Sequence, residues 1–138
     1  MSYRSGYEDK VAAYLDSLGI KYEYESYSFG YTSKVRTGVC GNCGSSNIVK
    51  ERWYTPDFFL PNGIIIEAKG YFKPTHRKTI LDAINGDNEL TVDNLYLLFQ
   101  RNNKYGRADK RYSDWCEQHS INYAISLNGE VPKEWIYG

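Results

Sequence analysis

The chain has 138 residues, with 17 basic and 17 acidic side chains, 41% hydrophobic residues and 25% charged residues. This composition is typical of one folded, soluble domain, and no apolar run is long enough to span a bilayer. Because its N-terminus has no signal peptide, the chain is predicted to be cytoplasmic and to have no membrane partner. A net charge of zero argues weakly against DNA binding, but the basic residues gather at 69–78 and 101–111, which is compatible with one basic face.

The first predicted element is a helix at 5–18. Val11 and Leu15 fall on one face of it, and Gly19 stands where a helix terminator belongs. Alternation of polar residues and tyrosine predicts a strand at 21–25. The segment 30–46 is rich in Gly, Ser and Thr, and we interpret it as an irregular excursion.

The rest of the chain alternates between strands and helices. Two strands, at 53–60 and 63–68, are predicted to form a hairpin around a turn at Pro61-Asn62-Gly63. The further expected elements are a helix at 75–84, a buried strand at 95–99, a helix at 112–119 and a strand at 122–125. This order indicates a single α/β domain spanning 1–138.

The main chemical motif is Asp57 followed, after nine residues, by Glu67-Ala68-Lys69. Strand side chains alternate, so Glu67 and Lys69 should emerge on one side, and the hairpin should bring Asp57 beside them. Two carboxylates at one point suit Mg²⁺ or Mn²⁺, and a nearby lysine can stabilise charge on a phosphate. The alternative is a surface strand with an ordinary Glu–Lys pattern.

Glu8 is the second notable acid. Its spacing from Ser5 fits a capping box, in which each side chain satisfies a backbone donor of the first helical turn. It also lies three residues before Val11 on the inward face, where a carboxylate needs a metal or a basic partner. The two interpretations are compatible with each other.

Several motifs, in order along the chain, resemble the phage endonuclease I family of Holliday-junction resolvases. They are Arg-Ser-Gly-Tyr-Glu-Asp-Lys at 4–10, Gly-Ile-Lys-Tyr-Glu-Tyr-Glu at 19–25, Tyr-Thr-Pro-Asp-Phe at 54–58, Leu-Pro-Asn-Gly-Ile at 60–64, Glu-Ala-Lys-Gly at 67–70, Cys-Glu at 116–117 and Pro-x-Glu-Trp-Ile at 132–136. The resemblance implies a restriction-endonuclease-like mixed sheet flanked by helices, in an intertwined, domain-swapped homodimer.

The resemblance also implies roles for individual residues. Asp57, Glu67 and Lys69 match the catalytic residues of the family, and Glu8 matches a further metal-site acid that comes from the other subunit. The implied activity is cleavage of branched DNA, four-way junctions above all, with Mg²⁺ or Mn²⁺ bound by Asp57, Glu67 and Glu8. The implied location is the cytoplasm of the host cell.

An insertion at about 37–52 departs from the family and holds Cys40-Gly-Asn-Cys43. This spacing has the form of a zinc knuckle, but one pair supplies only two of the four ligands that structural zinc needs. Cys116 is better explained as a small buried hydrophobe, and His76 and His119 are isolated candidates. We expect two copies of Cys40 and Cys43 to meet across the dimer and bind one zinc; the alternative is two free thiols.

These observations predict a metal-dependent endonuclease that resolves four-way junctions and other branched DNA. One alternative is a less selective DNA-degrading nuclease. Another is a non-catalytic, zinc-stabilised DNA-binding module, which the complete set of Asp57, Glu67 and Lys69 argues against because binding alone does not require it.

Overall fold

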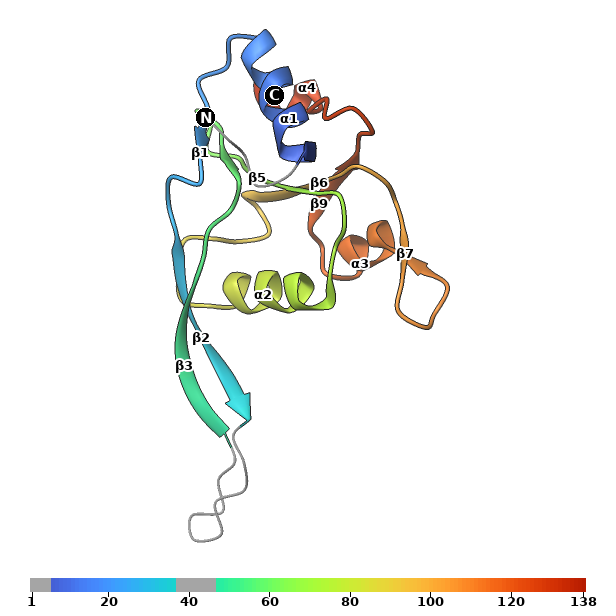
Figure 1. The fold of residues 1–138 in the computed structure, drawn as a ribbon. Coiled ribbons are helices and arrows are strands. Elements are labelled where there is room, and N and C mark those ends of the chain that lie inside the picture. Colours follow the sequence, from blue (N-terminus) through green and yellow to red (C-terminus); the bar gives the residue numbers. More distant parts are fainter. Residues whose placement is uncertain (1–5, 37–46) are drawn as a thin grey trace, which may run out of the picture.

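The computed structural model describes residues 6–36 and 47–138 (Figure 1). Cys40 and Cys43 lie outside the described residues, so the zinc site expected there stays a prediction. Ser5, the other half of the expected capping box, lies outside them as well. Within the described ranges, no helix is both long and apolar enough to cross a membrane.

A mixed five-stranded sheet forms the centre of the protein, in the order β1-β4-β5-β6-β9. Its strands are β1 (Glu23–Tyr24), β4 (Phe58–Phe59), β5 (Ile65–Lys69), β6 (Leu95–Phe99) and β9 (Asn122–Ile125). β4 pairs antiparallel with β1 and with β5, whereas β5, β6 and β9 are parallel. The predicted hairpin is therefore confirmed, with its turn at 61–63, where Leu60 and Ile64 close the loop by a hydrogen bond of 2.9 Å.

Helices cover both faces of this sheet, as a buried parallel sheet requires. One core contains Leu97 and Phe99 of β6 with side chains of α2 (Pro74–Ile84) and α3 (Tyr112–Gln118). The other contains Leu98 of β6 with side chains of α1 (Gly6–Ser17) and α4 (Lys133–Tyr137). The α/β class and the mixed sheet flanked by helices are confirmed, while the intertwined, domain-swapped dimer stays a prediction.

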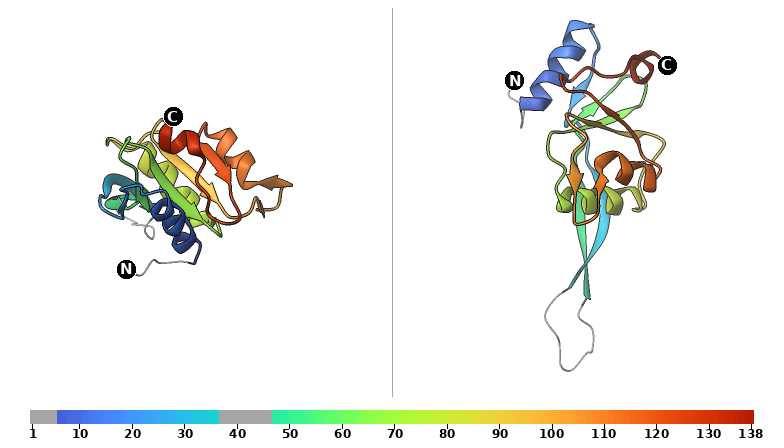
Figure 2. Two further views of the ribbon diagram at one scale, coloured as in Figure 1. Left: turned by 90° about the horizontal axis from the view of Figure 1, so that it is seen from above. Right: turned by 90° about the vertical axis from the view of Figure 1, so that its right-hand side faces the viewer.

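A long antiparallel hairpin connects β1 to β4 of the central sheet. β2 (Phe29–Arg36) pairs with β3 (Asn47–Tyr54) along its whole length, and Figure 2 shows this hairpin extending past α2. The predicted irregular excursion at 30–46 is therefore wrong for 30–36. The physical reason is alternation: Phe29, Tyr31 and Ser33 are buried beside α2, while Thr32 is exposed.

The strand predicted at 53–60 is divided in two. β3 ends at Tyr54, and Thr55-Pro56-Asp57 separates it from β4. Pro56 has no backbone N–H for a sheet, so a break here is expected. The chain therefore leaves the hairpin and enters the central sheet at Asp57.

The other predicted elements agree with the structure to within one or two residues. The sequence analysis did not predict residues 47–52 of β3, which it assigned to the insertion, the short helix α4, or the small hairpin of β7 (Lys104–Tyr105) and β8 (Lys110–Arg111). Helix α1 is followed by Gly19 with a positive φ of 69°, as its predicted role of terminator requires.

Candidate active site

The β4–β5 hairpin brings Asp57, Glu67 and Lys69 together. Phe58 of β4 pairs with Ile66 of β5, so Asp57, one residue earlier in the chain, lies beside Glu67. The backbone N–H of Ala68 donates a hydrogen bond of 2.9 Å to Oδ2 of Asp57. Nζ of Lys69 lies 3.8 Å from Oε2 of Glu67. The predicted strand geometry thus places both acids and the lysine at one point.

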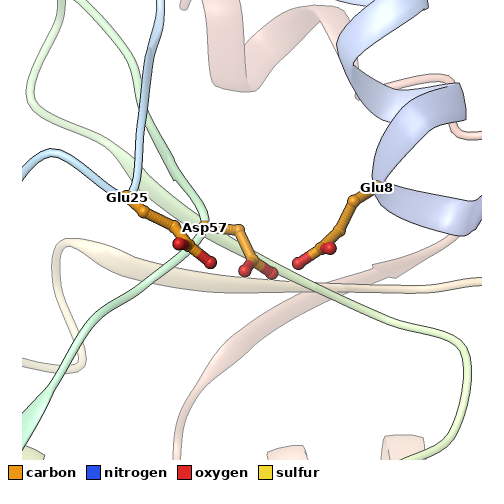
Figure 3. A group of neighbouring side chains, drawn as sticks. All are labelled: Glu8, Glu25 and Asp57. Atoms are coloured by element: carbon orange, nitrogen blue, oxygen red, sulfur yellow. The ribbon is translucent and has the colours of Figure 1, made fainter. Parts of the chain in front are cut away.

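Glu8 reaches the same point from helix α1, which packs against β5. Its carboxylate, with those of Glu25 and Asp57, provides oxygens that lie within 4.8 Å of one another. Figure 3 shows Asp57 between the other two. The buried position of Glu8 confirms that it faces inward, with 5% of its surface exposed. These contacts lie within one chain, and the supply of Glu8 by a partner subunit stays a prediction.

Glu25 is an acid that the sequence analysis placed only in a strand. It follows β1 with a positive φ of 49°, in the left-handed region. Its backbone N–H donates a hydrogen bond of 2.8 Å to the carbonyl oxygen of Asp57. The β1–β4 pairing therefore fixes Glu25 beside Asp57, a consequence of tertiary pairing that its local sequence does not reveal.

The acids are deeply buried, with 5% of Asp57 and 2% of Glu67 exposed. Burial, followed by the charge of Glu67, raises the pKa of Asp57 to about 11. Burial also raises the pKa of Glu67, although the positive charge of Lys69 opposes this rise. Without a bound cation, burial therefore favours the protonated form of these carboxyl groups more than in ordinary ones.

Glu67 has one satisfied and one unsatisfied oxygen. The hydroxyl of Tyr54 donates a hydrogen bond of 2.7 Å to Oε2, and burial raises the pKa of Tyr54 well above its usual value. Oε1 is buried and has no hydrogen-bond partner among the described residues. A buried carboxylate oxygen without a donor is costly, and a cation would satisfy it.

These groups line a cavity of about 300 Å³, and His76 of α2 forms part of its wall. Nδ1 of His76 is buried without a hydrogen-bond partner among the described residues. Burial, then the charges of Lys69 and Lys73, lower its pKa, which favours the neutral imidazole. The sequence analysis considered His76 only as an isolated zinc candidate, because nothing local connects α2 with the β4–β5 hairpin.

The other two zinc candidates lie elsewhere. Cys116 is completely buried in the core between β6 and α3, as predicted for a small hydrophobe. The ring of His119 packs against Trp115, with ring centroids 4.8 Å apart.

A model of the family described as phage endonuclease I matches residues 1–138. Two curated proteins are similar to the chain. Endonuclease I of Escherichia phage T7 is 36% identical over 135 residues, which are 98% of this chain and 78% of that protein. Endodeoxyribonuclease 1 of Enterobacteria phage T3 is 36% identical over 126 residues, which are 91% of this chain and 73% of that protein.

Proposed function

Because the chain belongs to the phage endonuclease I family, we propose that it is a divalent-metal-dependent DNA endonuclease that resolves four-way junctions and other branched DNA. The observation that carries this proposal is the meeting of the buried acids Asp57 and Glu67 with Lys69 in one cavity, beside Glu8. A protein that only binds DNA has no need of buried acids whose pKa values are raised at a cost in stability.

The donor set fits a hard cation. Asp57, Glu67 and Glu8 supply only carboxylate oxygens, which Mg²⁺ and Mn²⁺ prefer. Oε1 of Glu67 has no hydrogen-bond partner in the part of the chain that the structure describes. Glu25 offers a further carboxylate oxygen, within 4.8 Å of those of Glu8 and Asp57. When bound, such a cation neutralises the acids and supplies Lewis acidity toward a phosphate oxygen.

The remaining side chains position the reacting groups. Tyr54 holds Oε2 of Glu67, and the N–H of Ala68 holds Oδ2 of Asp57, so both acids are oriented before substrate arrives. Lys69 is partly exposed at the cavity, with 21% of its side chain accessible. Its ammonium group is placed to stabilise the negative charge that grows on the phosphate as water attacks.

We further propose that the working unit is a homodimer in the host-cell cytoplasm. In an exchanged dimer, α1 of one subunit would pack on β5 of the other, and the contacts of Glu8 described above would form between chains. Two such sites would cut symmetrically related strands of a branched substrate.

A cleavage assay with a labelled four-way junction and a matching linear duplex tests this function. With Mg²⁺ we expect paired nicks near the branch point, little cutting of the duplex, and none with EDTA. Asp57→Asn, Glu67→Gln and Lys69→Ala should each slow single-turnover cutting by about 100-fold or more, while binding of the junction persists. Lys133→Ala, which changes an exposed lysine on α4, is the matched control.

Two outcomes contradict parts of the proposal. If Lys69→Ala cuts within about threefold of the wild type, a loss far smaller than charge stabilisation supplies, the assigned centre is wrong. If duplex and junction are cut equally, the enzyme is a less selective nuclease and the junction preference is refuted.

A further inference from the structure

A second cavity, of about 610 Å³, lies next to the acidic cavity and shares Lys69 and His76 with it. Its other residues come from helix α1, from β5 and the segment after it, and from the residue that follows β6. The ones that matter here are Lys10, Tyr71 and Gln100. The volume lies within the range of about 300–1,000 Å³ typical of ligand sites. The two cavities therefore meet at Lys69 and His76.

The two cavities differ in charge. Glu25, Asp57 and Glu67 line the first together with Lys69. The second is lined by Lys10 and Lys69, and none of its described lining residues is acidic. The acids of the first cavity repel a phosphodiester wherever they are ionised, whereas the two lysines of the second attract it. This difference favours an anionic ligand in the second cavity.

Tyr71 adds an aromatic surface. It is 63% exposed, and it follows Gly70 directly after β5. Exposed aromatic rings beside basic groups are a common platform for stacking unpaired bases.

We propose that the second cavity is a nucleotide subsite for the residue adjoining the scissile phosphate. Its base stacks on Tyr71, and its outer phosphate contacts Lys10, while the scissile phosphate lies at Lys69 between the cavities. This inference rests on the proposed nuclease function and gives it a source of selectivity. A base pair at an open branch point lacks a stacking neighbour on one face, so withdrawing its base costs less free energy than in a linear duplex.

The first test is a substitution series at Tyr71, with affinity measured in EDTA so that no cutting occurs. Tyr71→Ala should weaken binding of a four-way junction by roughly 5- to 100-fold, and it should weaken binding of a linear duplex much less. Tyr71→Phe, which keeps the aromatic ring, should bind the junction like the wild type. Tyr137→Ala, at a tyrosine that is 64% exposed on α4, is the matched control. A Tyr71→Phe protein as weak as Tyr71→Ala, or an effect no larger than that of Tyr137→Ala, overturns the stacking role.

The second test measures how junction affinity depends on salt. Lys10→Gln should reduce the slope of log K against log salt by about 1, the value for one lost phosphate contact, and Lys133→Gln should leave it unchanged. An unchanged slope in Lys10→Gln overturns the phosphate contact. Both tests use binding alone, so they distinguish failure of the subsite from failure of the nuclease function, which the cutting assay detects separately.

Discussion

Replacing Asp57 with Asn should stabilise the protein in the absence of divalent metal. Asn keeps the size of Asp and an acceptor for the N–H of Ala68, which donates to Oδ2 at 2.9 Å. It removes a carboxyl group that is 5% exposed and lies beside Glu8, Glu25 and Glu67. The substitution therefore relieves burial and repulsion without leaving a cavity.

The magnitude follows from proton linkage. Asp57 has an ordinary pKa of 3.8 and a raised pKa in the folded protein, so the folded state binds more protons between these values. Its contribution to stability is present below about pH 4 and is lost as pH rises toward the folded pKa. At pH 7 the pH is about 3 units above the unfolded pKa, and each unit corresponds to about 1.4 kcal/mol. The loss of stability caused by the Asp57 carboxyl group at this pH is therefore at most about 4 kcal/mol. Allowing for relaxation of the buried site, we expect a gain of about 1–4 kcal/mol.

Thermal unfolding between pH 5 and 8, in EDTA and in Mg²⁺, measures this effect. In EDTA at pH 7 the Asp57→Asn protein should melt about 3–12 °C above the wild type, and its stability should fall less steeply with rising pH. Mg²⁺ should raise the melting temperature of the wild type more than that of the variant. Asp16→Asn, at an exposed acid on α1, is the control. A variant less stable than the wild type in EDTA at pH 8, or an unchanged pH dependence, refutes the reasoning.

Three further predictions concern other parts of the site. Tyr54→Phe removes the hydroxyl that donates to Glu67, so urea denaturation should show a free energy of unfolding lower by about 1–3 kcal/mol. An unchanged urea midpoint would show that this hydrogen bond does not stabilise the protein. A heterodimer of a Glu8→Ala chain and an Asp57→Ala chain should still nick a junction if the subunits exchange Glu8, because one site then has both acids. Complete inactivity of this heterodimer would rule out the exchange. Elemental analysis should find about one zinc per two chains, and no zinc after Cys40 and Cys43 are both replaced by Ser. One zinc per chain would indicate that each chain supplies all the ligands by itself.

The parts of the fold that sequence predicts are those with a local signal. The apolar run at 95–99 predicts a buried strand, and the turn at 61–63 predicts the hairpin that carries Glu67. Strand β2 has a local signal too, because buried and less buried residues alternate from Phe29 to Ser33. Its glycine, serine and threonine residues are typical of loops, and the strand was therefore not predicted. Residues that meet only because distant parts of the chain pack together have no local signal. For this reason the sequence analysis did not place Glu25 and His76 in the site.

The order in which the site's parts are synthesised has a consequence for the nascent protein. Glu8 and strand β1 leave the ribosome early, but β1 has no sheet partner until β4 appears, and α1 has no surface to cover until β5 is made. Strand β5 in turn needs β6, which follows a complete helix. The acids therefore assemble only after most of the chain has emerged. A chain that ends early therefore carries Glu8 but lacks the sheet that brings the other acids beside it.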